Sequence, residues 1–167
     1  KRYMPPVATA PSADAIKAAA ALLKGAKNVV ILAGRCSRSV EAWNARVALA
    51  EGLNAKVITE LKIGASFPTA HPLHAGAPGA LTAGTEAGNA LKAADVILSL
   101  DWVDLGGLLK TTFDGKAPTA KIIQASIDYT IHRGWSADYQ MLAPVDLILP
   151  SDPDATVPLL IKELGLN

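Results

Sequence analysis

Short apolar runs alternate along this sequence with segments whose apolar residues recur at helical spacing, and this alternation constrains the fold more than any other feature. The runs are rich in Val, Ile and Leu, a composition typical of strands buried on both faces of a parallel sheet. The predicted strands are residues 29–33, 56–59, 95–100, 120–125 and 145–149. Between the strands, apolar residues such as Ile16, Ala19 and Leu23 follow the spacing of a one-sided helix.

This order of elements predicts right-handed β-α-β crossovers between successive strands. We therefore expect an α/β fold with three layers. Its centre is a doubly wound, mainly parallel sheet of five or six strands, and helices cover both of its faces. Residues 12–167 are predicted to form this one domain, whereas the Pro-rich residues 1–11 are predicted to form an extended linker that follows another domain.

Capping residues indicate where the helices begin and end. Ser12 is a good N-cap for the first helix and Gly25 is expected to stop it, while the second helix is expected to end near Gly52. A loop rich in Gly, Pro and His is predicted over residues 64–84. The remaining predicted helices are one over residues 85–93, a short one carrying Leu105, Leu108 and Leu109, and a closing one carrying Val157, Leu160, Ile161 and Leu164.

Composition excludes several classes of partner. The formal net charge is only +1, which argues against nucleic acid or an acidic membrane surface as a partner. No apolar run approaches the roughly 20 residues of a membrane span. Cys36 is the single cysteine, so no disulfide can form within the chain and a cytoplasmic location is expected. Charged residues make up 19%, which indicates either an Ala-rich domain or a surface covered by other protein.

Ligands of open parallel sheets bind at the carboxyl ends of the strands, so the turns at those ends hold the candidate site residues. The first such turn is Gly34, Arg35, Cys36 and Ser37. Its backbone N–H groups stand before a predicted helix and could hold a phosphate. A single glycine is a weak phosphate signal, however, and the turn could equally need Gly34 only for its backbone angles.

Two further turns carry candidates. Asp101 and Trp102 follow the third predicted strand, where the indole could stack on a flat ring or cover the edge of the sheet. Ile127, Asp128 and Tyr129 follow the fourth. A carboxylate in this place can accept hydrogen bonds from ribose hydroxyls or can cap a turn.

No catalytic residue and no metal site is predicted. Pro72 separates His71 from His74, so these histidines do not form a helical metal-binding pair, and no cluster of cysteines or carboxylates accompanies them. Cys36 precedes a predicted helix, where a thiolate would be stabilised, but no base lies near it in the sequence. We therefore interpret it as an ordinary thiol.

Three blocks of sequence resemble the central domain of thiamine-diphosphate enzymes. Residues 28–34 resemble the first strand and turn of that domain, and residues 93–100 resemble its Ala-Asp-hydrophobic strand. The most specific block, residues 64–76, contains a Phe-Pro-x-x-His-Pro-Leu core. The nearest relatives implied are the acetolactate synthase large subunit, benzoylformate decarboxylase and oxalyl-CoA decarboxylase, and the resemblance covers nearly the whole chain.

The resemblance implies that the cofactor chemistry lies outside this chain. In that family two outer domains bind thiamine diphosphate and Mg²⁺ between subunits, so the expected partners are these N- and C-terminal thiamine-binding domains within a homo-oligomeric parent enzyme. The metal-binding Gly-Asp-Gly motif of the third domain does not occur here. The chain alone is therefore expected to be inactive, even with thiamine diphosphate and magnesium.

The resemblance leaves two hypotheses for the domain itself, because central domains of this family hold FAD, ADP or nothing. FAD-binding members carry a Gly-x-Arg-Phe-Asp-like segment where this chain has residues 101–105, and Ser151 and Ala65 replace family glycines, which counts against a flavin. The first hypothesis is a scaffold domain without a ligand of its own. The second is a regulatory module that binds ADP, FAD or CoA through Gly34, Arg35, Asp128 and Tyr129. A third hypothesis, a free-standing NAD-dependent enzyme, is disfavoured because the first turn has no second glycine and no catalytic base is evident.

Overall fold

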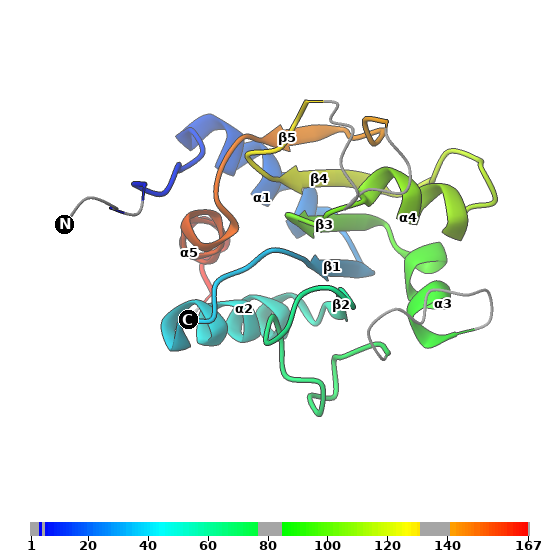
Figure 1. Cartoon of the computed structure of the whole chain (residues 1–167), viewed down its shortest axis with the longest axis horizontal. Helices are drawn as coiled ribbons and strands as arrows, with labels where there is room; N and C mark the ends of the chain where they lie inside the picture. The colour runs from blue at the N-terminus through cyan, green and yellow to red at the C-terminus, as the bar shows by residue number, and fades with distance from the viewer. Residues whose placement is uncertain (1–3, 5, 77–84, 131–140, 167) are drawn as a thin grey trace.

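The computed structural model describes residues 4, 6–76, 85–130 and 141–166. Within these residues strands and helices alternate along the chain (Figure 1). The strands are β1 Val29–Ala33, β2 Lys56–Thr59, β3 Val96–Leu100, β4 Lys121–Ala125 and β5 Leu147–Leu149. The helices are α1 Ala13–Gly25, α2 Val40–Leu53, α3 Glu86–Ala93, α4 Leu105–Thr112 and α5 Pro153–Leu164.

The described strands form one parallel sheet in the order β2-β1-β3-β4-β5. Between β1 and β3 the order reverses, because β2 lies on one side of β1 and the later strands lie on the other. This arrangement confirms the predicted doubly wound α/β fold. It also places the carboxyl ends of β1 and β3 next to each other, in register from Val29 opposite Val96 to Ala33 opposite Leu100.

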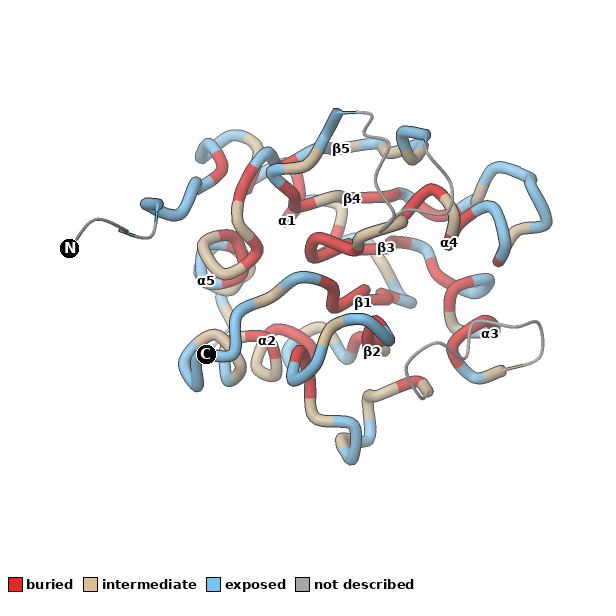
Figure 2. Tube along the Cα trace, viewed as in Figure 1, coloured by how far each residue is buried: buried red, intermediate tan, exposed pale blue. Residues whose placement is uncertain are grey.

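Helices cover both faces of the sheet (Figure 1). On one face α1, α2 and α5 pack together, with Ile16, Leu49 and Leu160 in a shared core. On the other face the shorter α3 and α4 pack on a second core through Leu91 and Leu108. Figure 2 shows that burial is continuous along the central strands, as expected from their apolar runs.

Three strands begin later than predicted, and an aspartate stands directly before two of them, β3 and β5. The Asp95 carboxylate accepts hydrogen bonds from the N–H groups of Lys27 and Asn28, which precede β1. The Asp146 carboxylate accepts one from Ile122 N–H and another from Lys121 Nζ. Both carboxylates thus bond groups at or before the start of a neighbouring strand. Hydrogen bonds stabilise the ionised form of both carboxylates and so lower their pKa values. The largest cause is the bond from Asn28 N–H for Asp95 and the bond from the Lys121 side chain for Asp146.

The helix ends follow the predicted caps with two differences. The Ser12 side chain accepts from Ala15 N–H, which confirms it as the N-cap of α1. Gly25 is the last residue of α1 and the chain leaves in an extended conformation. At the end of α2 the left-handed residue is Asn54, with φ 48°, rather than a glycine. Gly52 stays helical, and a Cβ there would press against the Leu166 side chain.

The Phe-Pro-x-x-His-Pro-Leu segment covers the free edge of β2. Val57 N–H donates to Leu73 O and Ala75 N–H donates to Val57 O, each at 2.8 Å, so residues 73–75 extend the sheet beyond β2. Phe67 from the same segment is buried in the first core. Residues 77–84 of the predicted loop lie outside the described residues. Among the helices that are described, none has the length and apolar character needed to cross a membrane.

Candidate functional site

The carboxyl ends of β1 and β3 form the switch point of this sheet, where nucleotide-binding relatives of this architecture open a crevice. Here the two strand ends stay together. Gly34 N–H donates to Leu100 O and Arg35 N–H donates to Asp101 O, each at 3.0 Å. The ladder between the strands therefore continues into the turns instead of splaying apart.

Gly34 allows this close approach. A Cβ at Gly34 would collide with the carbonyl group of Asp101 and with the Cα of Trp102. Asp101 turns its backbone toward Gly34 with φ 56°, a left-handed conformation that aspartate adopts more readily than most residues. Gly34 is thus needed for contact between two turns of the protein itself.

The N–H groups of the first turn, predicted as candidate phosphate ligands, all donate within the chain. Cys36 N–H donates to Gly34 O at 2.8 Å, and Ser37 N–H donates to the Asp154 carboxylate at 2.8 Å. Together with the bonds of Gly34 and Arg35, these contacts use every N–H of the turn.

Side-chain charges at the switch point also pair with one another. The Arg35 guanidinium makes a two-pronged contact with the Asp101 carboxylate, Nε to Oδ2 at 2.8 Å and Nη2 to Oδ1 at 2.9 Å. Its Nη2 also reaches Asp128 Oδ2 at 3.3 Å. The Ser126 hydroxyl donates to Asp101 as well. These contacts link the carboxyl ends of β1, β3 and β4.

The remaining candidates divide into buried and exposed side chains. Trp102 is only 7% exposed and belongs to the second core, which favours the covering interpretation of its indole. Ile127 and Tyr129 are 64% and 51% exposed. Ser126 caps this turn, since its Oγ accepts from Asp128 N–H at 2.9 Å, while the Asp128 carboxylate contacts Arg35. The structure thus joins Gly34, Arg35, Asp101 and Asp128 by direct contact and leaves the side chains of Ile127 and Tyr129 at the surface.

A buried arginine was missed by the sequence reasoning. Arg46 lies on the core-facing side of α2 and is 2% exposed. Its guanidinium donates to Ser66 O and Ser37 O at 2.8 and 2.9 Å, and to Asp154 Oδ1 at 2.8 Å. An arginine within the apolar stripe of a predicted helix is a local signal for such a network, because a buried charge needs partners.

Glu60 was missed although it directly follows β2 and so meets the rule that selected the other candidates. It is buried, and its Oε2 accepts from Val103 N–H at 3.2 Å. Burial raises the pKa of Glu60, while the Val103 N–H and the charges of Lys62 and Arg35 oppose the shift.

Cys36 and the two described histidines of the loop, His71 and His74, make contacts within the protein. Burial raises the pKa of Cys36 to about 12, so its thiol stays protonated. His71 contacts Glu51 at 3.2 Å, whereas His74 contacts Thr59 at 3.1 Å and its pKa is lowered by burial. Nowhere in the described ranges do three or more His, Cys, Asp or Glu residues gather as metal ligands would.

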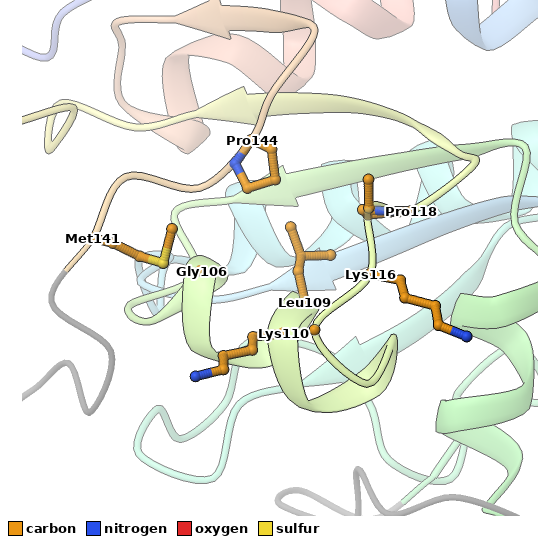
Figure 3. Close-up of a pocket in the computed structure, with 9 residues that line it drawn as sticks. Gly106, Leu109, Lys110, Lys116, Pro118, Met141 and Pro144 are labelled. Carbon is orange, nitrogen blue, oxygen red and sulfur yellow. The ribbon is translucent and has the colours of Figure 1, made fainter.

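A cavity of about 280 Å³ lies elsewhere, between α4 and the segment before β5 (Figure 3). Its described lining is mainly apolar, and in Figure 3 the ammonium groups of Lys110 and Lys116 point away from each other. Because Pro118 and Pro144 precede β4 and β5, the cavity lies toward the amino ends of those strands. It is therefore separate from the switch point.

The family follows from comparison with known proteins. The family described as the thiamine pyrophosphate enzyme central domain matches residues 16–151, which include the whole sheet and the switch point. This chain belongs to that family. The resemblance seen in the sequence is thereby confirmed, and the family implies thiamine diphosphate in the parent enzyme.

One curated relative of this central domain is an acetyltransferase. Over 91 residues the central domain is 43% identical to sulfoacetaldehyde acetyltransferase of Rhodobacter capsulatus, an alignment that covers 54% of this chain and 15% of that protein. The chain thus matches only a small part of this relative, whose remaining length lies outside the alignment.

Solved structures share the fold of this central domain. A thiamin diphosphate-dependent enzyme from Mycobacterium smegmatis matches with a TM-score of 0.67 at 23% identity, over 97% of this chain and 30% of that chain. Benzoylformate decarboxylase from Polynucleobacter necessarius matches with a TM-score of 0.67 at 22% identity, over 100% of this chain and 31% of that chain. At such identities these likenesses establish the fold alone.

Proposed function

We propose that this chain is the non-catalytic scaffold domain of a thiamine-diphosphate-dependent enzyme. In this role it spaces the two cofactor-binding domains of the parent chain, residues 1–11 link it to the first of them, and it holds no nucleotide of its own. The observation that carries the proposal is the closed switch point, where Gly34 contacts Asp101 directly and the N–H groups of the turn donate within the chain.

The residues of this domain do not fit the cofactor that the family implies. Binding of Mg²⁺ with a diphosphate needs oxygen ligands gathered at one place. The part of the chain that the structure describes gathers no such group, and the sequence has no Gly-Asp-Gly motif. We therefore assign the binding of thiamine diphosphate and Mg²⁺ to the outer domains, between subunits of a homo-oligomeric, cytoplasmic parent enzyme.

For the parent we propose a reaction that cleaves or forms a bond next to the carbonyl group of a 2-oxo acid or a related compound. Thiamine diphosphate supplies a carbanion and an electron sink for such reactions. The likeness to an acetyltransferase supports this class of chemistry. The contribution of the central domain is to hold its neighbours at a fixed spacing.

The activity test compares the 167-residue chain with a longer protein that includes its neighbouring domains. Both are supplied with thiamine diphosphate, Mg²⁺ and a panel of 2-oxo acids and sulfoacetaldehyde. We expect turnover only from the longer protein. Turnover by the 167-residue chain would contradict the assignment, because it would require a reaction centre built from these residues.

Binding calorimetry separates the scaffold from its rival, the nucleotide-binding regulatory module. The rival is favoured by one observation, the exposed ring of Tyr129 one residue after Asp128 at the carboxyl end of β4. We expect no binding heat with ADP, CoA, FAD or NAD. Saturable binding of any of them would favour the rival, and its loss in a Tyr129→Ala variant would locate the site at the β4 end.

A further inference from the structure

The Asp154 carboxylate occupies a place that is built for an anion. Its Oδ2 accepts from Ser37 N–H and its Oδ1 accepts from Arg46 Nη1, both at 2.8 Å. Ser37 stands two residues before the N-cap of α2, and Asp154 itself lies in the first turn of α5. The carboxylate is therefore bound by one backbone donor and one guanidinium near the positive ends of two helices.

Besides the two helix ends, the surroundings of the Asp154 carboxylate include the buried guanidinium of Arg46. The guanidinium is fixed from three sides, by Ser66 O, Ser37 O and Asp154. Two of those three partners are neutral carbonyl groups, so Asp154 supplies the only negative charge among them. A guanidinium buried to this degree is unstable without an opposite charge.

Ser66, a carbonyl partner of Arg46, carries an unpaired hydroxyl group. The hydroxyl group of Ser66 is buried and has no hydrogen-bond partner among the described residues. The carbonyl of the same residue accepts from Arg46 Nε at 2.8 Å, so the backbone of Ser66 contacts the guanidinium. A buried hydroxyl without a partner is uncommon in folded proteins, and this one belongs to a residue of the cluster.

We propose that Asp154 is a built-in substitute for a bound oxyanion, and that its removal converts the Arg46–Ser37 cluster into a binding site for phosphate. The inference rests on the proposed scaffold function, because it explains how the first turn comes to need no ligand. One carboxylate opposes the site: Asp152 caps α5, and its Oδ1 accepts from Asp154 N–H. Phosphate therefore binds the opened site only where the guanidinium outweighs this repulsion.

The test is rescue by phosphate of an Asp154→Ala variant of the 167-residue chain. Thermal unfolding is followed in sodium phosphate and in sodium chloride of equal ionic strength, for the parent sequence and for D154A. We expect D154A to gain about 4 °C in Tm when phosphate reaches ten times its dissociation constant, while the parent sequence gains nothing from phosphate. The amide resonance of Ser37 should shift with phosphate in D154A only.

The double variant R46M/D154A is the matched control, because it lacks the charge that would hold the phosphate. We expect no phosphate-specific gain in this variant. Equal gains in the parent sequence and D154A, or a gain that persists in R46M/D154A, would overturn the inference. If D154A does not fold, D154S replaces it, since the short serine side chain keeps an N-terminal helix residue but vacates most of the place of the carboxylate.

Failure of this inference and failure of the scaffold assignment give different results. Nucleotide binding by the unsubstituted 167-residue chain would contradict the scaffold assignment, whatever the result for D154A. Absence of rescue in D154A would defeat the built-in anion alone, and the parent sequence could still be silent in calorimetry.

Discussion

The switch point and the end of β4 lie at the same rim of the sheet but are built differently. At the switch point, Gly34, Asp101 and Trp102 are buried and the turns after β1 and β3 bond each other directly. At the end of β4, Ile127 and Tyr129 are mostly exposed. Arg35 joins the two regions through Asp101 and Asp128, and its own side chain is 41% exposed.

This difference teaches how one architecture can keep or lose a ligand. A crevice between parallel strands exists only if the turns part and leave backbone N–H groups free. Here the backbone N–H groups of the first turn bond within the chain. We therefore propose that the polar residues of the switch point act in folding and that a ligand would first be sought at the exposed β4 end, and the contrast can be measured through stability.

The largest effect is expected from Arg46→Met, which breaks the hydrogen-bond network that joins Arg46 to Ser37, Ser66 and Asp154. This change removes three hydrogen bonds and leaves the Asp154 carboxylate without its buried counter-charge. We expect a loss of about 4 kcal/mol in the free energy of unfolding, measured by urea denaturation.

Arg38→Met is the matched control, since Arg38 is an exposed arginine of the same turn region. It should change stability by less than about 0.5 kcal/mol. Similar losses in the two variants would mean that Arg46 acts only as a surface charge and that the switch point needs no network.

A somewhat smaller loss is expected from Gly34→Ala, which tests the contact that closes the crevice. The added Cβ meets the backbone of Asp101 and Trp102, and backbone cannot move aside as a flexible side chain can. We expect a loss of about 3 kcal/mol in thermal or urea unfolding. Gly25→Ala is the control, because nothing lies within 4 Å of its Cβ position, and it should be neutral or slightly stabilising. A stable G34A would show that the turns can part.

The fold was predictable because burial on both faces leaves continuous apolar runs, which a single sequence reveals. The N-cap at Ser12 and the short helix around Leu108 were also predictable, because their signals lie within a few neighbouring residues. The closure of the switch point was not. It joins Arg35 to Asp101, which are 66 residues apart, and no local pattern indicates that the two turns meet.

The Arg46–Asp154 pair shows the same limit more strongly. Its members are 108 residues apart and meet only because α2 and α5 pack side by side on one face. Arg46 was not among the predicted site residues, and no local pattern in the sequence indicates that Asp154 is its partner. The candidates at Ile127 and Tyr129 were selected from strand position, which gives the rim but not the exposure of a side chain.

A gain in stability, smaller than these losses, is expected from Glu60→Gln at neutral pH. Burial raises the pKa of Glu60, so its contribution to stability is complete below the ordinary glutamate value and is lost as pH rises through the folded-state value. Gln keeps an acceptor for Val103 N–H without the buried charge. We expect E60Q to exceed the parent in Tm at pH 7 and to lose this advantage near pH 4.

Glu41→Gln is the control for that pH series. It removes an exposed carboxylate from the first turn of α2, where negative charge is favourable, so its effect at pH 7 should have the opposite sign. An E60Q advantage that did not depend on pH would attribute the gain to packing instead of to the buried charge.

The smallest effect is expected at the β4 end, from the double variant Ile127→Ser, Tyr129→Ala. Both side chains are exposed, so little apolar surface returns to water when they are truncated. We expect unfolding within about 0.5 kcal/mol of the parent sequence. A loss as large as that of G34A would erase the contrast between the two regions, because it would show that the β4 end is also held by its own side chains. An unchanged stability would mean that folding does not require these two exposed apolar side chains. They would then be the first place to look for contacts with a neighbouring domain or a ligand.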